Sequence, residues 1–161
     1  MDITVRAKQR LSKTAAKQKA EQYCVYQERA QEEVRNKLYQ WGLYPNEVEE
    51  VIAELIMDNF LNEERFAMAY VSGKFKMKGW GRIKIKQGLK QKQVSPRLIK
   101  EAIQAIDAAD YHTTLLSILE KKASVLKEAN PLKRKQKLLQ HAMLKGYEND
   151  LVFDILNNKE L

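Results

Sequence analysis

The sequence predicts an all-α protein made of three tandem three-helix repeats, which we expect to form an elongated, curved array. The chain has 161 residues with only three prolines and six glycines, a composition that favours helices over a turn-rich β architecture. Its apolar residues recur at helical spacing. The same apolar pattern also returns at intervals near fifty residues, which is typical of repeat proteins.

The repeat is carried by five apolar positions that are kept in three copies. A shift of 51 residues relates the first two copies and a shift of 53 the last two, and the first shift also superposes two prolines. The positions are Val34, Leu38, Leu43, Val48 and Ile52, then Ile85, Leu89, Val94, Ile99 and Ile103, then Leu138, Ala142, Tyr147, Val152 and Leu156. A small three-helix core is therefore expected in each copy.

Each copy is expected to contain three helices joined by short connections. They are predicted over 12–27, 30–42 and 45–58, then 62–77, 81–93 and 95–108, then 110–128, 131–145 and 148–158. This gives a basic N-terminal extension over 1–15 and repeats over 16–58, 59–108 and 109–161.

Several helix starts have their own signals. Pro45, Pro96 and Pro131 suit the first helical position, where a missing N–H costs nothing. Ser95 and Asn130 precede two of them as good N-caps, whereas Tyr44 is a weak one. Asn62 caps the helix over 62–77, and the acids that follow it suit the positive end of that helix. The alternating segment "RIKIK" is assigned to the helix over 81–93, because Ile85 and Leu89 occupy repeat positions.

The charges fall in blocks along a chain of net charge +8. Arg6 to Lys19 holds six bases and no acid, Glu47 to Glu64 seven acids and no base, and Lys74 to Lys100 ten bases and no acid. Lys133, Arg134, Lys135 and Lys137 form a fourth cluster. Any one block fits a solvated helix face. Their alternation indicates a positive and a negative surface, which could face a bipolar partner, and the net charge suggests a polyanionic one.

Several classes of function are not expected. No apolar run is long enough to span a membrane, and the N-terminus lacks an apolar signal-peptide core. The single cysteine, Cys24, fits a reducing cytoplasm and is expected to be a small buried side chain. Two histidines and one cysteine give no recognisable metal site, and "GWG" lacks the spacing of a phosphate loop. We therefore expect no enzyme, metal or cofactor; Gly79 and Gly81 are expected in a turn, and Trp80 on the core.

The segment from Phe60 to Val94 resembles the RecX family of bacterial regulators of the RecA recombinase. The matching residues are Leu61, Asn62, Glu63, Arg65, Phe66, Ala67, Tyr70 and Val71, then Gly81, Arg82, Ile83, Leu89, Lys92 and Val94. Gln93 stands where the family usually has Gly, which predicts a slightly different helix exit. The first copy also fits the family pattern and the third fits more loosely, so the resemblance covers residues 16–158.

The resemblance implies a function that composition and spacing do not reach. RecX-like proteins bind the RecA–single-stranded-DNA filament in the cytoplasm, lie in its groove, restrain ATP hydrolysis and strand exchange, and favour filament shrinkage. The expected partners are thus RecA and its filament, with direct DNA contact open, no membrane, and a monomeric chain.

The basic block supplies the candidate filament-binding or DNA-binding residues: Lys74, Lys76, Lys78, Arg82, Lys84, Lys86, Lys90 and Lys92. The family-motif residues Leu61, Glu63, Arg65, Phe66, Ala67 and Tyr70 are expected to be structural, with Phe66 and Tyr70 in the core. Arg65 is expected to hold a carboxylate, with Asp58 as the candidate.

Two other functions remain open. One is a helical DNA-binding or RNA-binding module that acts without a recombinase. Its lysine-rich contacts would favour the nucleic-acid backbone over sequence readout. The other is a scaffold whose acidic and basic faces bind only proteins.

Overall fold

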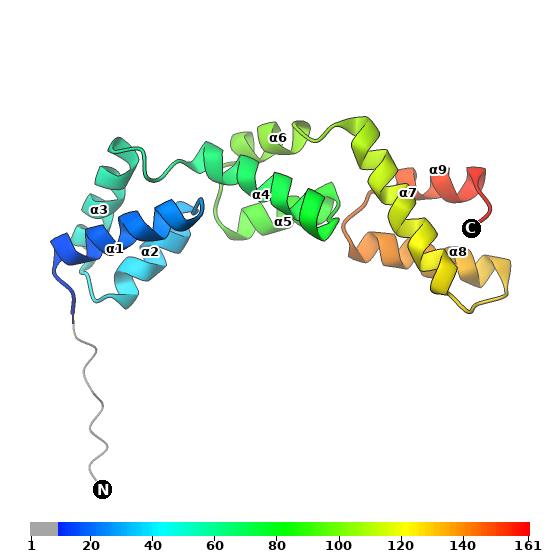
Figure 1. The fold of residues 1–161 in the computed structure, drawn as a ribbon, viewed down its shortest axis with the longest axis horizontal. Helices are drawn as coiled ribbons and strands as arrows, with labels where there is room; N and C mark the ends of the chain where they lie inside the picture. The colour runs from blue at the N-terminus through cyan, green and yellow to red at the C-terminus, as the bar shows by residue number, and fades with distance from the viewer. Residues whose placement is uncertain (1–9) are drawn as a thin grey trace, which may run out of the picture. The chain divides into compact units, whose positions relative to one another are not determined.

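The computed structural model describes residues 10–161, and over this range the chain folds into nine α-helices with no strand (Figure 1). The helices are α1 (Lys13–Tyr26), α2 (Gln31–Gln40), α3 (Pro45–Met57), α4 (Glu63–Lys78), α5 (Arg82–Gln91), α6 (Pro96–Gln104), α7 (Ala108–Val125), α8 (Pro131–Leu144) and α9 (Asn149–Asn158). The predicted all-α class is confirmed. Of the basic extension predicted over 1–15, residues 1–9 lie outside the described residues.

The repeated apolar positions form the cores of the three-helix domains. All of them are buried except Ile103, which is partly exposed. The periodicity in the sequence therefore records burial. The helix predicted over 95–108 is the one whose end differs most, since α6 already ends at Gln104. Asp107 caps the next helix instead, accepting a hydrogen bond of 2.9 Å from the Asp110 N–H.

The proline signals mark helix starts as predicted, but their caps differ. Asn130 and Asn62 each accept a backbone N–H, from Lys133 at 3.1 Å and from Arg65 at 2.9 Å. Ser95 occupies an N-cap position without a capping side-chain bond. At the weak start, Glu47 accepts the Tyr44 N–H at 3.0 Å and thus satisfies one of the N–H groups left free at a helix start.

The middle helix of each copy ends in the same way. Gly42, Gln93 and Gly146 are related by the repeat shifts, and all three have positive φ, of 88°, 59° and 97°. A left-handed residue just after a helix is a common way to end it, and glycine adopts that conformation without strain. The different exit predicted at Gln93 is therefore wrong, because Gln93 adopts the conformation that glycine would favour.

The chain packs into two compact units. One holds the described residues up to Phe66 together with Lys92–Val94, and the other holds Ala67–Gln91 and Ser95–Leu161. The core of the first unit lies between α1, α2 and α3 and includes Cys24, Leu38 and Leu55. Burial raises the pKa of the Cys24 thiol to about 11, so the thiol stays protonated at neutral pH.

In the first unit, the basic and acidic blocks of the sequence pair with each other. Arg10 pairs with Glu47, and Lys13 lies 2.7 Å from Glu50. Lys17 lies 3.4 Å from Asp58. The expectation that these blocks form two separate surfaces for a bipolar partner is therefore wrong in this part of the chain. Lys17 also lies 3.2 Å from Glu54. Lys13 and Lys17 on α1 and Glu50 and Glu54 on α3 are each four residues apart, so each pair lies on one face of its helix and the two faces meet.

The family-motif residue Arg65 ties together the turn after α3. Its guanidinium donates to Glu28 at 2.9 Å, to the Asn59 side chain at 2.8 Å and to the Asn59 carbonyl at 2.9 Å. Asn59 has a φ of 63°, so these bonds hold a left-handed turn in place. The carboxylate partner of Arg65 is thus Glu28 and not Asp58, the candidate expected from the sequence.

The other motif residues also contribute to packing. Leu61, Phe66 and Ala67 are buried, while Tyr70 is half-buried rather than in the core. Tyr70 lies against Gly88 of α5 so closely that a Cβ at Gly88 would overlap its ring.

In the second unit, the second and third three-helix domains meet at a pair of glycines. The Gly81 N–H donates to the Lys145 carbonyl at 2.8 Å, and the Ile83 N–H donates to the Gly146 carbonyl at 3.0 Å. A Cβ on Gly81 would lie within 2.6 Å of the Tyr147 nitrogen. The glycine in "GWG" is therefore needed for close backbone approach as well as for a turn.

Candidate functional site

The candidate site is the basic block from Lys74 to Lys100, which spans the end of α4, a turn, α5 and the start of α6. Gly79 ends α4 with a φ of 66°, and its own N–H donates to the Phe75 carbonyl at 3.1 Å. This is the hydrogen-bond pattern of a left-handed helix cap. Lys76 and Lys78 lie in the last turn of α4, where cations favour the negative end of the helix dipole.

Two of the predicted lysines are held on an aromatic side chain. The Lys74 amine lies 4.8 Å from the ring centre of Trp80, and the Lys84 amine lies 4.4 Å from it. The ring itself is half-buried, so the expectation that Trp80 packs on the core is met only in part. These cation–π contacts fix the positions of two positive charges at the turn.

Arg82 is engaged inside the second unit. Its guanidinium lies 2.8 Å from Glu148 and 3.9 Å from the ring centre of Tyr111. Its backbone N–H donates to the Tyr111 hydroxyl at 3.0 Å, and that hydroxyl donates to Glu148. Burial, followed by the bond to Glu148, raises the pKa of Tyr111 above its usual range, so the phenol remains a donor. These contacts join α5 to α7 and to the start of α9.

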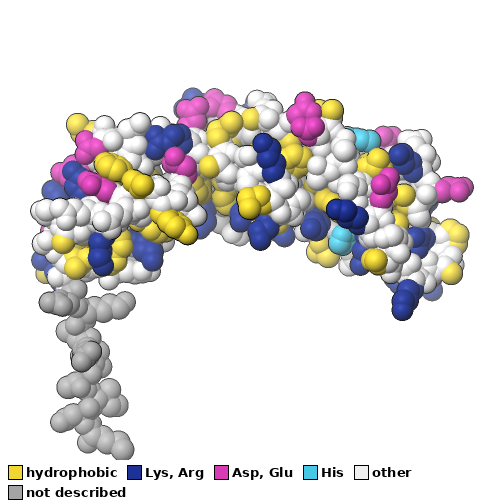
Figure 2. Space-filling model, in the orientation of Figure 1, with side chains coloured by type: hydrophobic (Ala, Val, Ile, Leu, Met, Phe, Trp, Pro, Cys, Tyr) yellow, Lys and Arg dark blue, Asp and Glu magenta, His cyan; other side chains and the backbone are white. Residues whose placement is uncertain are grey.

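The remaining candidates differ in their surroundings. Lys92 lies 3.6 Å from Glu33 within the first unit. Lys76, Lys78, Lys86 and Lys90 are exposed, and none forms an ion pair with an acid among residues 10–161. Figure 2 shows Lys and Arg side chains gathered along the lower edge of the region that Figure 1 labels α4 and α5. This exposed part of the block can attract an anionic partner.

A groove of about 600 Å³ lies beside the end of α4 and runs along α7. Its polar lining consists of the lysines Lys76, Lys78 and Lys121, the hydroxyl side chains of Thr113, Thr114 and Ser117, and one carboxylate, that of Asp110. Ammonium and hydroxyl groups are the usual donors to phosphate oxygens. Sequence reasoning missed Lys121 and the hydroxyls, because only the fold brings α7 next to the end of α4.

A second groove, of about 440 Å³, lies between α5 and α6. Lys86, Lys90 and Lys100 surround an apolar surface of Pro96, Ile99 and Ile103. Lys100 and these apolar side chains were not predicted as site residues. The step of four between Ile99 and Ile103, matched by that between Lys86 and Lys90, was the available signal.

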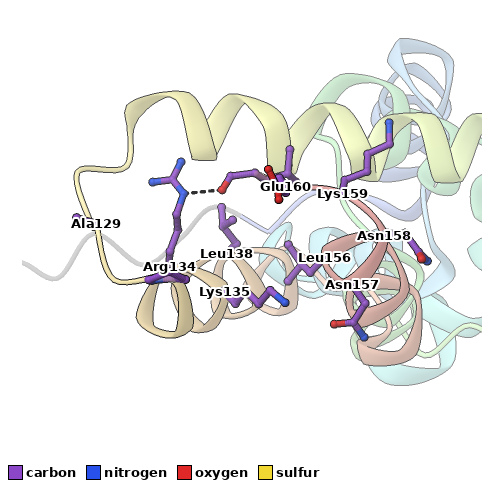
Figure 3. Close-up of a pocket in the computed structure, with 11 residues that line it drawn as sticks. Ala129, Arg134, Lys135, Leu138, Leu156, Asn157, Asn158, Lys159 and Glu160 are labelled. Carbon is purple, nitrogen blue, oxygen red and sulfur yellow. Dashed lines mark hydrogen bonds between the residues drawn. The ribbon is translucent and has the colours of Figure 1, made fainter.

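The fourth basic cluster is partly internal. The Arg134 guanidinium donates to the carbonyls of Leu161 and Ala123, both at 2.6 Å, and to that of Leu126 at 3.0 Å. Figure 3 shows Arg134 at one side of a pocket of about 550 Å³, facing the last residues of the chain. Lys137 lies 3.0 Å from Glu128. These contacts connect the ends of α7, α8 and α9.

In residues 10–161 no cluster of three or more His, Cys, Asp or Glu side chains could hold a metal ion. Burial lowers the pKa of His141, and the nearby Lys122 and Lys145 lower it further. None of the helices in this range has the length and apolar character needed to cross a membrane.

Comparison with known families matches the three-helix organisation domain by domain. Profiles described as the first, second and third three-helix domains of RecX match residues 16–55, 62–103 and 109–156. The crystal structure of RecX from Lactobacillus salivarius superposes with a TM-score of 0.81 at 22% identity, covering 91% of this chain and 95% of that one. Another crystal structure, of a regulatory protein RecX, gives a TM-score of 0.82 at 20% identity, covering 91% of this chain and 72% of that one.

Curated relatives agree in sequence. A regulatory protein RecX from Clostridium perfringens is 32% identical over 137 residues, which is 81% of this chain and 64% of the relative. The chain thus spans less than two thirds of that relative's length. A regulatory protein RecX from Pasteurella multocida is 33% identical over 117 residues, which is 72% of this chain and 70% of the relative. The three matched domains, the shared fold and these identities show that the chain belongs to the RecX family of regulatory proteins.

Proposed function

We propose that the protein modulates the RecA recombinase by binding in the groove of the RecA–single-stranded-DNA filament. There it restrains ATP hydrolysis, strand exchange and filament growth, without catalysing a reaction itself. Membership of the RecX family supports RecA as the partner, because the resemblance to that family implies regulation of RecA. The relatives are named regulatory proteins, which agrees with such a role. The proposed place of action is the cytoplasm, where the filament forms.

The observation that carries the proposal is the exposed part of the basic block. Lys76, Lys78, Lys86 and Lys90 have no acidic partner among the described residues, although acids elsewhere in the chain pair with bases. Uncompensated like charges on neighbouring turns oppose folding slightly. They favour association with a polyanion, because binding releases counterions from its phosphates. A filament built on single-stranded DNA offers such phosphates along its length.

The test is the single-stranded-DNA-dependent ATPase of the cognate RecA, measured with increasing amounts of this protein. We expect hydrolysis to fall and preformed filaments to shorten. RecA assayed without DNA is the control for effects unrelated to filaments. An ATPase that is unchanged at micromolar concentrations of this protein would reject the proposed function.

A second candidate function is nucleic-acid binding that does not need a recombinase. The groove along α7 favours it, because three lysines and three hydroxyl side chains line it against a single carboxylate, and such groups bind phosphates. Fluorescence anisotropy with labelled single-stranded DNA, in the absence of RecA, separates the two functions. Tight binding to free DNA combined with an unaffected RecA ATPase would favour this second function.

A further inference from the structure

The groove between α5 and α6 is lined by both apolar and positively charged side chains. We call Pro96, Ile103 and the almost fully buried Ile99 its floor, and Lys86, Lys90 and Lys100 its rim. The groove lies entirely within the second compact unit. Its size, about 440 Å³, is enough for one or two bulky side chains but not for a large ligand.

One residue of the groove floor, Ile103, is less buried than the residues at the same repeat position in the other two copies. Ile103 corresponds to Ile52 and Leu156 in the other two copies, and those residues are 3% and 4% exposed. Ile103 alone remains partly exposed and lines the groove. The second copy therefore keeps an apolar side chain at this position without burying it in its own core. An apolar surface that a partner covers would explain this difference.

The rim limits the chemistry of that partner. Its three lysines have no acidic partner among the described residues, so carboxylates of a partner could pair with them. The groove has no aromatic lining for stacking bases and none of the hydroxyl groups found in the groove along α7. Single-stranded nucleic acid relies on stacking, whereas a peptide can place an aliphatic or aromatic side chain on Pro96 and Ile103. The lining thus favours a peptide over a nucleic acid.

We propose that this groove binds an acidic segment of RecA that inserts one bulky apolar side chain between its carboxylates. The inference rests on the proposed function and adds the chemistry of the contact. The inserted side chain covers Ile103, and the carboxylates on either side pair with Lys86, Lys90 and Lys100. Such a contact sets the position of the protein on the filament through RecA itself and assigns Lys86 and Lys90 to it, which leaves Lys76 and Lys78 for phosphate.

The direct test is site-specific photo-cross-linking. Gln104 lies at the rim of the groove and is exposed, so benzoylphenylalanine can replace it without disturbing the core. The full-length variant is irradiated on RecA–single-stranded-DNA filaments, and cross-linked peptides are identified by mass spectrometry. We expect a RecA segment that carries several Asp or Glu residues around an apolar one. Cross-linking to DNA, to a second copy of this protein or to a basic RecA segment would overturn the groove assignment. Filament binding with no cross-link would overturn it too.

A pair of matched substitutions gives a second readout. Ile103→Gln places an amide in the groove, whereas Ile56→Gln makes the same change at an isoleucine of α3 that is 43% exposed and outside the groove. We expect the first variant to bind filaments at least tenfold more weakly and the second to bind like the wild type, with binding compared at a temperature where circular dichroism shows both variants folded. Equal binding by both variants would refute the groove.

The charge of the rim is tested in the same way. Lys100→Glu reverses a rim lysine, and Lys127→Glu reverses an exposed lysine between α7 and α8 that has no ion pair among residues 10–161. We expect only Lys100→Glu to weaken filament binding by tenfold or more. If the wild type itself fails to bind filaments, the proposed function fails as a whole. If the wild type binds and both variants bind equally, only the groove assignment fails.

Discussion

Single residues in this protein show how local conformation and long-range contacts compete. Gln93 adopts a left-handed conformation, with a φ of 59°, at the place where the other two copies have glycine. A residue with a Cβ pays about 1–2 kcal/mol for that conformation. The strain persists because the flanking residues are tied down, with Val94 buried and Lys92 paired with Glu33. A family pattern of glycine at this position therefore has a conformational cause.

Gln93→Gly should therefore stabilise the protein. Relief of left-handed strain contributes about 1–2 kcal/mol, and the added freedom of glycine in the unfolded chain takes back about 0.4–1 kcal/mol. The free energy of unfolding, measured by urea denaturation, should thus rise by roughly 0.5–1 kcal/mol. The matched control is Gln87→Gly, at an exposed helical position in α5, which should lose about 0.5–1 kcal/mol. Two losses of equal size would show that the left-handed strain at Gln93 is negligible.

At the scale of helices, charge pairs line the contact between α1 and α3. Arg10, Lys13 and Lys17 face the acids of α3 and the cap after it. Glu47 has two roles, because it accepts the Tyr44 N–H at the helix start and pairs with Arg10. The bond from the Tyr44 N–H lowers the pKa of Glu47 most, and Arg10 lowers it further. Exposed pairs of this kind are individually weak, so their number and alignment matter more than any one pair.

The lowered pKa of Glu47 predicts a dependence of stability on pH. Because the folded-state pKa lies below the ordinary value of 4.5, the folded protein binds this proton less readily than the unfolded chain does. The contribution of Glu47 to stability is therefore complete at pH values above its unfolded-state pKa. It is lost as the pH falls through the lower folded-state pKa. Glu47→Gln should lower the free energy of unfolding at pH 7, and the difference from the wild type should shrink toward pH 3.

A glutamate without such contacts provides the control for that titration. Glu120 is exposed on α7 and forms no ion pair among the described residues. Glu120→Gln should leave the free energy of unfolding unchanged at both ends of the pH range. A Glu47→Gln deficit that stayed constant from pH 7 to pH 3 would show that the loss comes from packing or capping geometry and not from charge.

At the scale of the whole molecule, three of the four charge blocks are used at least in part to build the fold. The blocks around Arg10 and Glu47 pair with each other, and the block around Arg134 binds backbone carbonyls and Glu128. In the remaining block, Arg82 and Lys92 are also engaged internally. What is left within this block is a set of exposed lysines on α4 and α5, which is why this surface is proposed for binding.

The helices were predictable from the sequence because their signals are local. Apolar spacing, prolines at helix starts and Asn62 as a cap depend on residues a few positions apart. Whether each basic residue is exposed or paired inside the fold was not predictable, because its partners lie far away in the sequence. Arg82 meets Glu148, 66 residues later, and α7 brings hydroxyl groups to the end of α4. The partly exposed Ile103 also looked like a core position in the repeat, and only the packing of its own copy distinguishes it.

The last prediction concerns how the exposed lysines meet the filament. Lys76 and Lys78 line the groove along α7 and are unpaired among the described residues, so we expect them to contact DNA phosphate. The double change Lys76→Gln and Lys78→Gln removes both charges without placing acids at the negative end of α4, which would destabilise the helix. Filament affinity should fall, and the slope of log affinity against log salt should become shallower by about 1.4, since each phosphate contact to a single strand contributes roughly 0.7.

The control for this prediction removes the same charge from a different place. Lys133 and Lys135 on α8 are exposed and form no ion pair within residues 10–161, so their double change to Gln alters net charge equally. If the basic surface of α4 acts through local phosphate contacts, only the α4 variant changes the salt slope. An equal change in both variants would mean that net charge, not this surface, draws the protein to the filament. If the salt slope is unchanged in both variants, neither pair of lysines contacts DNA phosphate, and Lys76 and Lys78 do not belong to the binding site.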